Sequence, residues 1–290
     1  MLEHMEDDYK NPKRVIVIGS KGFVGSSIIN LLIKNNINVV SISKDDIDLT
    51  IKNSYKKILS IVEDNDVLVT VSAIAPVRNF EIFKLNLKIL ENFKNFFNFF
   101  KPKYLLNIGS DAVFYDTMSN LSENSPKAPD NLHGLMHLTR EIILKQAISK
   151  TSLGCLRPTL IYGKNDPHNG YGPNSFNRKI KNNEDVVLFG KGEEIRDHIC
   201  VEDVANLALK MIQKKSYGSL NAVTGDGITF QEIASLLKLY YNSKSKIIET
   251  KRNNPMPHNG FRQFDNSNIF KAFPDVKIKK FDEGMKKLVD

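Results

Sequence analysis

The sequence predicts an α/β fold built on a doubly wound parallel sheet, with a smaller lobe added towards the C-terminus. Three observations support this prediction. Short apolar runs alternate with helical segments up to Tyr162, glycines mark the junction between the first run and the first helix, and the pattern beyond Tyr162 loosens into short mixed elements. Strands that alternate with helices in this way pair in parallel through crossover connections, which gives a doubly wound sheet.

The expected elements follow in chain order. Four apolar runs predict buried strands, at residues 14–18, 37–43, 66–76 and 104–110. Helices are expected after the first glycines, ending near Asn35, then at residues 54–62, and in LENFKNFFNFFKP. In this last segment helical spacing predicts a core-facing stripe, with a subunit interface as the alternative, formed by Phe93, Phe96, Phe97 and Phe100. The segment DNLHGLMHLTRE, residues 130–141, predicts a further amphipathic helix.

Composition and charge argue against several classes of protein. Lys and Arg (41) outnumber Asp and Glu (33), which gives a formal net charge of +8, but the lysines are scattered. This distribution is typical of a solvated surface, so no nucleic-acid partner is expected. No apolar run reaches the length of about 18 residues that a membrane span needs, and no signal-peptide layout opens the chain. Cys155 and Cys200 are far apart and support neither a disulfide framework nor a zinc site, so a cytoplasmic protein is expected.

A glycine-rich turn joins the first strand to the first helix. Gly19, Gly22 and Gly25 form the pattern G-x-x-G-x-x-G directly after VIVI. Such glycines allow a sharp turn, the close approach of a pyrophosphate to the backbone, and close packing of helix on strand. The N-terminus of the helix offers free N–H groups and the positive end of its dipole to the anion. We therefore expect a dinucleotide to bind here.

The end of the second strand indicates which dinucleotide binds. An acidic residue there would bind the 2′-hydroxyl of NAD, but NVVSISK ends in Ser43 and Lys44. Lys21 also lies within the glycine turn. These residues favour NADP, with its 2′-phosphate, although Asp45 and Asp46 follow closely and leave NAD as the alternative.

Further motifs follow the glycine turn in order. They are DIDLT (46–50), VSAIAP (71–76), NIGSDAVF (107–114), LRPTLIYG (156–163) and FGKGEEIRDHICVEDVA (189–205). Together with GSKGFVG (19–25) they resemble the extended short-chain dehydrogenase/reductase family of NAD(P)-dependent nucleotide-sugar epimerases, dehydratases and reductases. The resemblance implies a Rossmann-type domain at residues 5–165, to which 200–224 return, and a substrate-binding lobe at 166–199 and 225–290. Residues 1–4 are interpreted as a cloning remnant outside the fold.

The same resemblance assigns residues to two ligands. The cofactor, NADP or NAD, is expected against the glycine turn and its neighbours, namely Gly19, Lys21, Gly22, Phe23, Val24, Gly25, Ser43, Lys44, Asp48, Leu49, Ala73, Pro158 and Thr159. A nucleotide-diphosphate sugar is expected against Asn174, Arg196 and Arg262, with Arg196 on the diphosphate. Ser110 is expected to hold the reacting sugar oxygen.

The departure from the family lies in its catalytic helix. Relatives carry Y-x-x-x-K, whereas the matching positions here are His133 and His137. Tyrosine is the acid/base in relatives and needs help to lower its pKa of about 10, but the pKa of histidine starts at about 6.5. His133 is therefore expected to exchange a proton with the sugar hydroxyl. His137, one turn away on the same helix face, is expected to hydrogen-bond the nicotinamide ribose.

The histidines also allow other interpretations. The i,i+4 spacing occurs in zinc sites, but no third ligand and no H-E-x-x-H context accompanies it, so no metal is expected. The site could be degenerate, which would leave a non-catalytic protein that binds or senses the cofactor. His133 could also be an introduced substitution for tyrosine in an otherwise active enzyme. Of the remaining histidines, His168 and His258 lie in expected loops, as solvated residues or as part of the sugar pocket, and His198 is expected to be structural.

Asp111, next to Ser110, is a further candidate acid. Relatives that dehydrate the sugar carry an Asp-Glu pair after the hydroxyl residue, and the second position here is Ala112. Elimination needs an acid and a base at adjacent carbons, whereas epimerisation or ketone reduction needs a hydride and one proton carrier. The sequence therefore predicts a nucleotide-diphosphate-sugar epimerase or 4-keto reductase. The resemblance also implies a homodimer, formed through the Phe-rich helix and the helix that carries His133.

Overall fold

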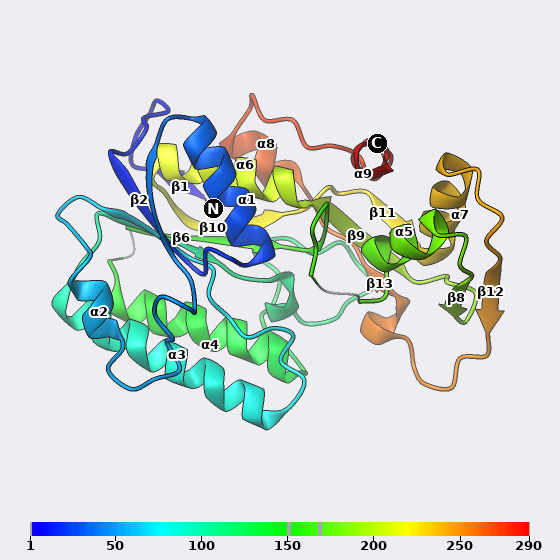
Figure 1. Cartoon of the computed structure of the whole chain (residues 1–290), viewed down its shortest axis with the longest axis horizontal. Helices are drawn as coiled ribbons and strands as arrows, with labels where there is room; N and C mark the ends of the chain where they lie inside the picture. Colours follow the sequence, from blue (N-terminus) through cyan, green and yellow to red (C-terminus); the bar gives the residue numbers. More distant parts are fainter. Residues whose placement is uncertain (1, 150–151, 168–169, 290) are drawn as a thin grey trace.

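A parallel sheet forms the centre of the computed structural model, which describes residues 2–149, 152–167 and 170–289. Its seven strands lie in the order β1, β10, β6, β5, β4, β2, β3 (Figure 1). Their bounds are Glu3–His4 (β1), Ser216–Ala222 (β10), Leu153–Pro158 (β6), Tyr104–Ile108 (β5), Val67–Thr70 (β4), Arg14–Ile18 (β2) and Asn38–Ile42 (β3). All neighbours are parallel except β1, which is antiparallel to β10. The predicted doubly wound α/β fold is confirmed, and the four predicted strands are β2 to β5.

Helices cover both faces of this sheet (Figure 1). One face carries α1 (Phe23–Lys34), α6 (Val201–Lys214) and α8 (Ser267–Ala272), and the other carries α2 (Tyr55–Leu59), α3 (Phe80–Phe99) and α4 (Leu132–Ala147). Successive side chains of a strand point to opposite faces, so a strand covered on both sides must be apolar throughout. In β2, Val15 and Val17 accordingly pack into the apolar cluster that includes Ile28 of α1. Ile16 and Ile18 pack into the cluster on the other face, which includes Phe93 of α3.

The Phe-rich helix α3 packs its aromatic stripe into the core. Phe93, Phe96 and Phe97 are completely buried, whereas Phe99 on the other side of the helix is exposed. The helix begins where the side chain of Asn79 accepts a hydrogen bond of 2.9 Å from the N–H of Ile82. The core-facing interpretation of the stripe is therefore confirmed for these three residues.

The first residues of the chain take part in the sheet. Glu3 and His4 pair with Tyr217 and Ser216 on β10. The His4 ring also lies 2.8 Å from the Ser216 hydroxyl and 3.0 Å from the Ala272 carbonyl oxygen. The expectation that residues 1–4 lie outside the fold is wrong for these two residues. An added edge strand satisfies backbone groups that β10 would otherwise leave unpaired.

A smaller lobe lies beside the sheet, on the right in Figure 1. It contains β7 (Leu160–Tyr162), α5 (Pro173–Lys181), β8 (Val186–Phe189), β9 (Ile195–Cys200), β11 (Gly227–Thr229), α7 (Phe230–Tyr240), β12 (Ile247–Thr250), β13 (Phe261–Arg262) and α9 (Phe281–Val289). Strand β9 pairs with β7, β11 and β13, and β8 pairs with β12. The lobe has its own apolar cluster, in which Phe176, Ile233 and Leu237 are buried. The domain boundaries predicted above stay a prediction.

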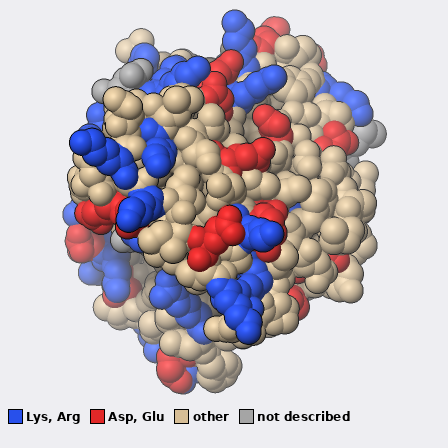
Figure 2. Space-filling model, turned by 90° about the vertical axis from the view of Figure 1, so that its right-hand side faces the viewer, with Lys and Arg blue, Asp and Glu red and all other residues tan. Residues whose placement is uncertain are grey.

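The surface and the helices add two findings. On the face of the molecule that Figure 2 shows, basic and acidic side chains are interspersed. This mixture suits the solvated-surface interpretation of the positive net charge. Within the part of the chain that the structure describes, no helix combines the length and apolar character needed to cross a bilayer.

Candidate active site

Two adjoining cavities open where the parallel strands end, which is where open α/β sheets bind ligands. The larger has a volume of about 750 Å³ and the smaller about 210 Å³, and both are lined by Gly22, Val71 and Ala73. Every residue predicted to take part in catalysis or ligand binding lines one of the two, with the exception of Gly25. The structure therefore brings together residues from position 19 to position 262.

The glycine turn has the geometry of a phosphate cradle. Gly19 adopts a left-handed φ of +101°, and a Cβ there would lie 2.7 Å from the backbone nitrogen of Ser72. A Cβ on Gly25 would lie 2.2 Å from the Gly19 carbonyl oxygen, so Gly25 acts through packing rather than by lining a cavity. Gly22 caps α1 without a side chain, which leaves the first N–H groups of this helix without a side-chain acceptor. These features fit the phosphates of a dinucleotide.

The smaller cavity carries the residues expected to read the adenosine ribose. Lys21 Nζ lies 2.7 Å from Asp45, and Lys44 Nζ lies 3.8 Å from Asp48, in two exposed ion pairs. Asp46 instead turns back on the chain, where it accepts hydrogen bonds from the hydroxyl and the N–H of Ser43. These hydrogen bonds lower the pKa of the Asp46 carboxyl. Both lysines thus stand at the rim of the cavity, held only by pairs that contribute little free energy.

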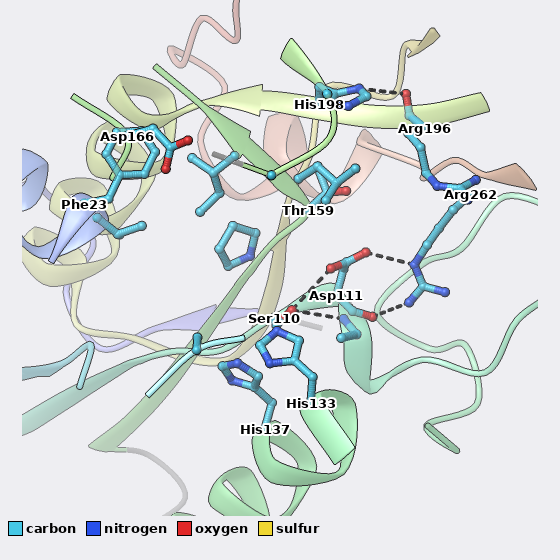
Figure 3. Close-up of a pocket in the computed structure, with 18 of the residues that line it drawn as sticks. Phe23, Ser110, Asp111, His133, His137, Thr159, Asp166, Arg196, His198 and Arg262 are labelled. Carbon is cyan, nitrogen blue, oxygen red and sulfur yellow. Dashed lines mark hydrogen bonds and ion pairs between the residues drawn. The ribbon is translucent and has the colours of Figure 1, made fainter. Parts of the chain in front are cut away.

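Helix α4 presents both histidines to the larger cavity, in the region of Ser110 (Figure 3). Asn131 caps the helix by accepting a 2.9 Å hydrogen bond from the N–H of Gly134. A Cβ on Gly134 would lie 2.1 Å from the Ala112 carbonyl oxygen, so this glycine permits the close approach of α4 to the segment that follows β5. That approach places His133 beside Ser110 and Asp111.

The two imidazole rings share a desolvated environment. Their centroids lie 4.8 Å apart, and neither Nδ1 atom has a hydrogen-bond partner. Burial lowers the pKa of His133, against the opposing effect of the Asp111 carboxylate. Burial lowers the pKa of His137 much further, and His133 and Arg140 add to this shift. No group of three or more His, Cys, Asp or Glu side chains in the described ranges is arranged to hold a metal ion.

Ser110 and Asp111 connect this helix to the opposite wall of the cavity. The Ser110 hydroxyl accepts a hydrogen bond of 3.1 Å from the N–H of Ala112 and donates one of 3.3 Å to Asp111. Asp111 also accepts a hydrogen bond of 2.9 Å from Nε of Arg262, as the dashed lines in Figure 3 show. The candidate acid therefore forms an ion pair with Arg262.

The two arginines predicted to bind the diphosphate both contact protein groups. Arg262 also donates to Asp116 at 2.6 Å, and Arg196 donates to Glu194 at 2.8 Å and to the Pro257 carbonyl oxygen at 2.6 Å. Their contact with a diphosphate stays a prediction. The remaining predicted contacts, Pro158, Thr159 and Asn174, line the larger cavity with them.

The segment that carries His258 lies beside these arginines. His258 and Asn259 have left-handed φ values of 53° and 52°, and His258 Nδ1 lies 2.7 Å from Asp116 Oδ1. His258 lines the larger cavity, as one of its two sequence interpretations allowed. His198 is buried, as a structural residue would be, and it also lines this cavity. His168 lies outside the described residues.

Two charged residues at the site escaped sequence reasoning. Glu194 lines the larger cavity and accepts from both Arg196 and Arg252. Its position two residues before Arg196, directly ahead of strand β9, was the available signal, because side chains two apart in extended backbone share a face. Arg140 is buried and lines neither cavity, but it lowers the pKa of His137, and it follows His133 by seven positions, which places it on the same stripe of α4.

Comparison with known proteins agrees with this geometry. The model of the NAD-dependent epimerase/dehydratase family matches residues 15–222. The chain belongs to this family. It is 24% identical to a putative UDP-glucose 4-epimerase of Methanocaldococcus jannaschii, over 95% of this chain and 97% of the relative. It is 26% identical to the CDP-abequose synthase of Salmonella typhimurium, over 77% of this chain and 79% of the relative.

Solved structures of nucleotide-sugar enzymes share the fold. A GDP-L-fucose synthetase of Naegleria fowleri bound to NADP superposes with a TM-score of 0.80 at 16% identity, over 99% of this chain and 94% of the other. The UDP-glucose 4-epimerase of Thermus thermophilus in complex with NAD gives a TM-score of 0.77 at 20% identity, over 96% and 98%. Of these two neighbours, one was solved with NADP and the other with NAD.

Proposed function

We propose that the protein is an NAD(P)-dependent nucleotide-diphosphate-sugar epimerase or 4-keto reductase in which His133 carries the proton. One observation carries the proposal. His133 lines the same cavity as Ser110, at the position that resemblance assigns to the catalytic tyrosine. The names of two relatives, a putative UDP-glucose 4-epimerase and a CDP-abequose synthase, support this substrate class.

The dinucleotide is held by the glycine turn and the smaller cavity. When bound, it supplies or accepts the hydride. Gly19 and Gly22 give its phosphates access to the backbone, and the first N–H groups of α1 donate to them. Lys21 and Lys44 flank the position expected for the adenosine ribose, which favours NADP because a 2′-phosphate needs basic neighbours.

The proton path starts at the sugar hydroxyl, which Ser110 binds. Burial keeps the pKa of His133 below its ordinary value, so the ring is neutral near pH 7 and able to accept the hydroxyl proton in the oxidation that begins epimerisation. The Asp111 carboxylate stabilises the imidazolium that results. In ketone reduction the protonated ring donates the proton to the ketone oxygen and returns to the neutral state. His137 is neutral as well, which suits a hydrogen bond with the nicotinamide ribose. Ala112 provides no second carboxylate, so epimerisation or ketone reduction is favoured over dehydration.

The decisive comparison is between the unaltered protein, His133→Tyr and His133→Phe. Nicotinamide absorbance and sugar products are followed over a panel of UDP-, GDP-, CDP- and dTDP-sugars and their 4-keto derivatives. We expect turnover by the unaltered protein and its loss in His133→Phe. Turnover by His133→Tyr alone would show that His133 marks a disabled site in an otherwise active enzyme. Binding of NADPH without turnover by any of the three would favour a non-catalytic sensor.

We also propose a homodimer formed through α3 and α4. The outer faces of these helices expose apolar side chains, among them Phe80 and Leu87 on α3 and Leu135 and Ile142 on α4. Apolar patches of this kind mark interaction surfaces. Sedimentation velocity should give a dimer, and Leu135→Glu together with Ile142→Glu should give a monomer. A monomeric unaltered protein at micromolar concentration would contradict the proposal.

A further inference from the structure

Helix α4 carries a buried arginine that forms no ion pair with any described residue. Arg140 is 1% exposed, and its Nη1 donates one hydrogen bond of 2.8 Å to the Ser72 carbonyl oxygen. Its guanidinium carbon lies 5.6 Å from the centre of the Phe93 ring. Nε and Nη2 have no hydrogen-bond partner, and no ion pair to Arg140 occurs within the described residues.

A second buried arginine nearby shows the usual arrangement. Arg157 is also completely buried, and it forms a two-point ion pair with Glu141 through hydrogen bonds of 2.7 Å each. Glu141 directly follows Arg140 on α4, so one helix supplies the partner of the paired arginine and also carries the unpaired one. Burying an unpaired charge is unfavourable. Burial lowers the pKa of Arg140 to about 10, which still leaves it protonated at neutral pH.

The unpaired charge lies directly behind the glycine turn. Ser72, the acceptor of the Arg140 hydrogen bond, lines the smaller cavity. Its backbone packs so tightly against Gly19 that a Cβ on Gly19 would lie 2.7 Å from the Ser72 nitrogen. One residue therefore separates the guanidinium from the turn that is expected to hold the phosphates. In a region of low dielectric, a charge acts over such a separation.

We propose that Arg140 is the buried countercharge of the bound dinucleotide, left uncompensated in the free protein and compensated when the phosphates occupy the turn above Ser72. The inference rests on the proposed function. Arg140 touches neither cavity, so it is an electrostatic and positioning residue that acts through Ser72 and Gly19. The same charge disfavours a second cation at the neighbouring His137, in keeping with the neutral state of that ring.

The test compares Arg140→Met with Arg157→Met as the matched control. Urea unfolding is measured without ligand, and NADPH binding is measured by fluorescence titration. We expect Arg140→Met to unfold at the same or a higher urea concentration than the unaltered protein, because it removes an uncompensated charge. It should bind NADPH about tenfold more weakly, which corresponds to about 1.4 kcal/mol. Arg157→Met should unfold at lower urea because it removes the two-point partner of the buried Glu141, which then has only Lys145 at 3.7 Å.

Three further outcomes decide the inference. Arg140→Lys, which keeps the charge, should retain most of the affinity for NADPH. Unaltered NADPH affinity in Arg140→Met, or a loss of urea stability as large as that of Arg157→Met, would overturn the countercharge role and leave the proposed function standing. Failure of the unaltered protein to bind NADPH would overturn both proposals, so the two failures are distinguishable.

Discussion

The rings of His133 and His137 meet edge to face at an interplanar angle of 87°, with their centroids 4.8 Å apart. Two positive charges at this separation inside the protein would repel strongly. The pair therefore accepts at most one proton under ordinary conditions. Because the pKa of His137 is depressed further than that of His133, the first proton is expected on His133.

The titration of this pair can be observed directly by NMR of histidine-labelled protein. We expect the His133 signals to titrate below the ordinary value of about 6.5 and the His137 signals to stay neutral well below that pH. Activity that needs neutral His133 is then complete at pH 7 and falls as the solution is acidified through its pKa. His133→Gln and His137→Gln provide the assignments. A His137 ring that is charged at pH 6.5 would contradict this prediction.

The glycine turn allows a matched pair of alanine substitutions. In Gly25→Ala the new methyl group would lie 2.2 Å from the Gly19 carbonyl oxygen, whereas in Gly22→Ala it would lie 3.3 Å from the same atom. We expect Gly25→Ala to lose NADPH binding and to lower the urea midpoint, because the helix must move away from the strand. Gly22→Ala should keep its urea midpoint close to that of the unaltered protein. Equal shifts of the urea midpoint in the two variants would show that the close contact at Gly25 does not explain the need for glycine there.

Lys21 is expected to distinguish the two dinucleotides. Its ammonium group pairs with Asp45 in an exposed position, so this pair contributes little to folding stability. Lys21→Ala should weaken NADPH binding by about tenfold, equivalent to about 1.4 kcal/mol, and leave NADH binding nearly unchanged. Titrations with both dinucleotides at constant ionic strength measure the ratio. A loss of affinity that is equal for both would place Lys21 on the pyrophosphate instead.

Acid sensitivity is expected to depend on His198. Burial lowers the pKa of this ring to about 3, while the unfolded chain protonates it near the ordinary value of about 6.5. The unfolded state then binds a proton that the folded state does not, so stability is complete above about pH 6.5 and falls as the pH drops towards 3, with a slope of up to about 1.4 kcal/mol per pH unit.

His198→Phe provides the comparison, because the ring lies among Phe230 and Phe281, with centroid distances of 5.9 Å and 5.5 Å. Urea unfolding between pH 8 and pH 4.5 should show a shallower loss of stability in this variant than in the unaltered protein. The measurement at pH 8 controls for any change in packing. Parallel curves for the two proteins would assign the acid sensitivity to other groups, among them His137.

Local pattern sufficed for four of the seven strands of the sheet and for the positions of most of the site. Apolar runs that alternate with helical segments predicted β2 to β5, because a strand covered on both faces must be apolar throughout. Helical periodicity placed His133 and His137 on one face of α4 before any contact was known. Excluding residues 1–4 from the fold was wrong for Glu3 and His4, because they pair with β10, more than two hundred residues away in the chain. Their interpretation as a cloning remnant stays a prediction.

The doubly wound fold, the glycine turn and the placement of two histidines at the family's acid/base positions could all be predicted from the sequence, since all three follow from spacing along the backbone. The pairing of charges could be seen only in the folded chain. Arg262 forms an ion pair with Asp111, which lies 151 residues earlier in the chain. Arg157 forms an ion pair with Glu141, whereas Arg140 has no acidic partner among the described residues. The ion pairs that form depend on how far apart distant segments lie in the folded chain and on how much water packing excludes. Local spacing in the sequence predicts neither property.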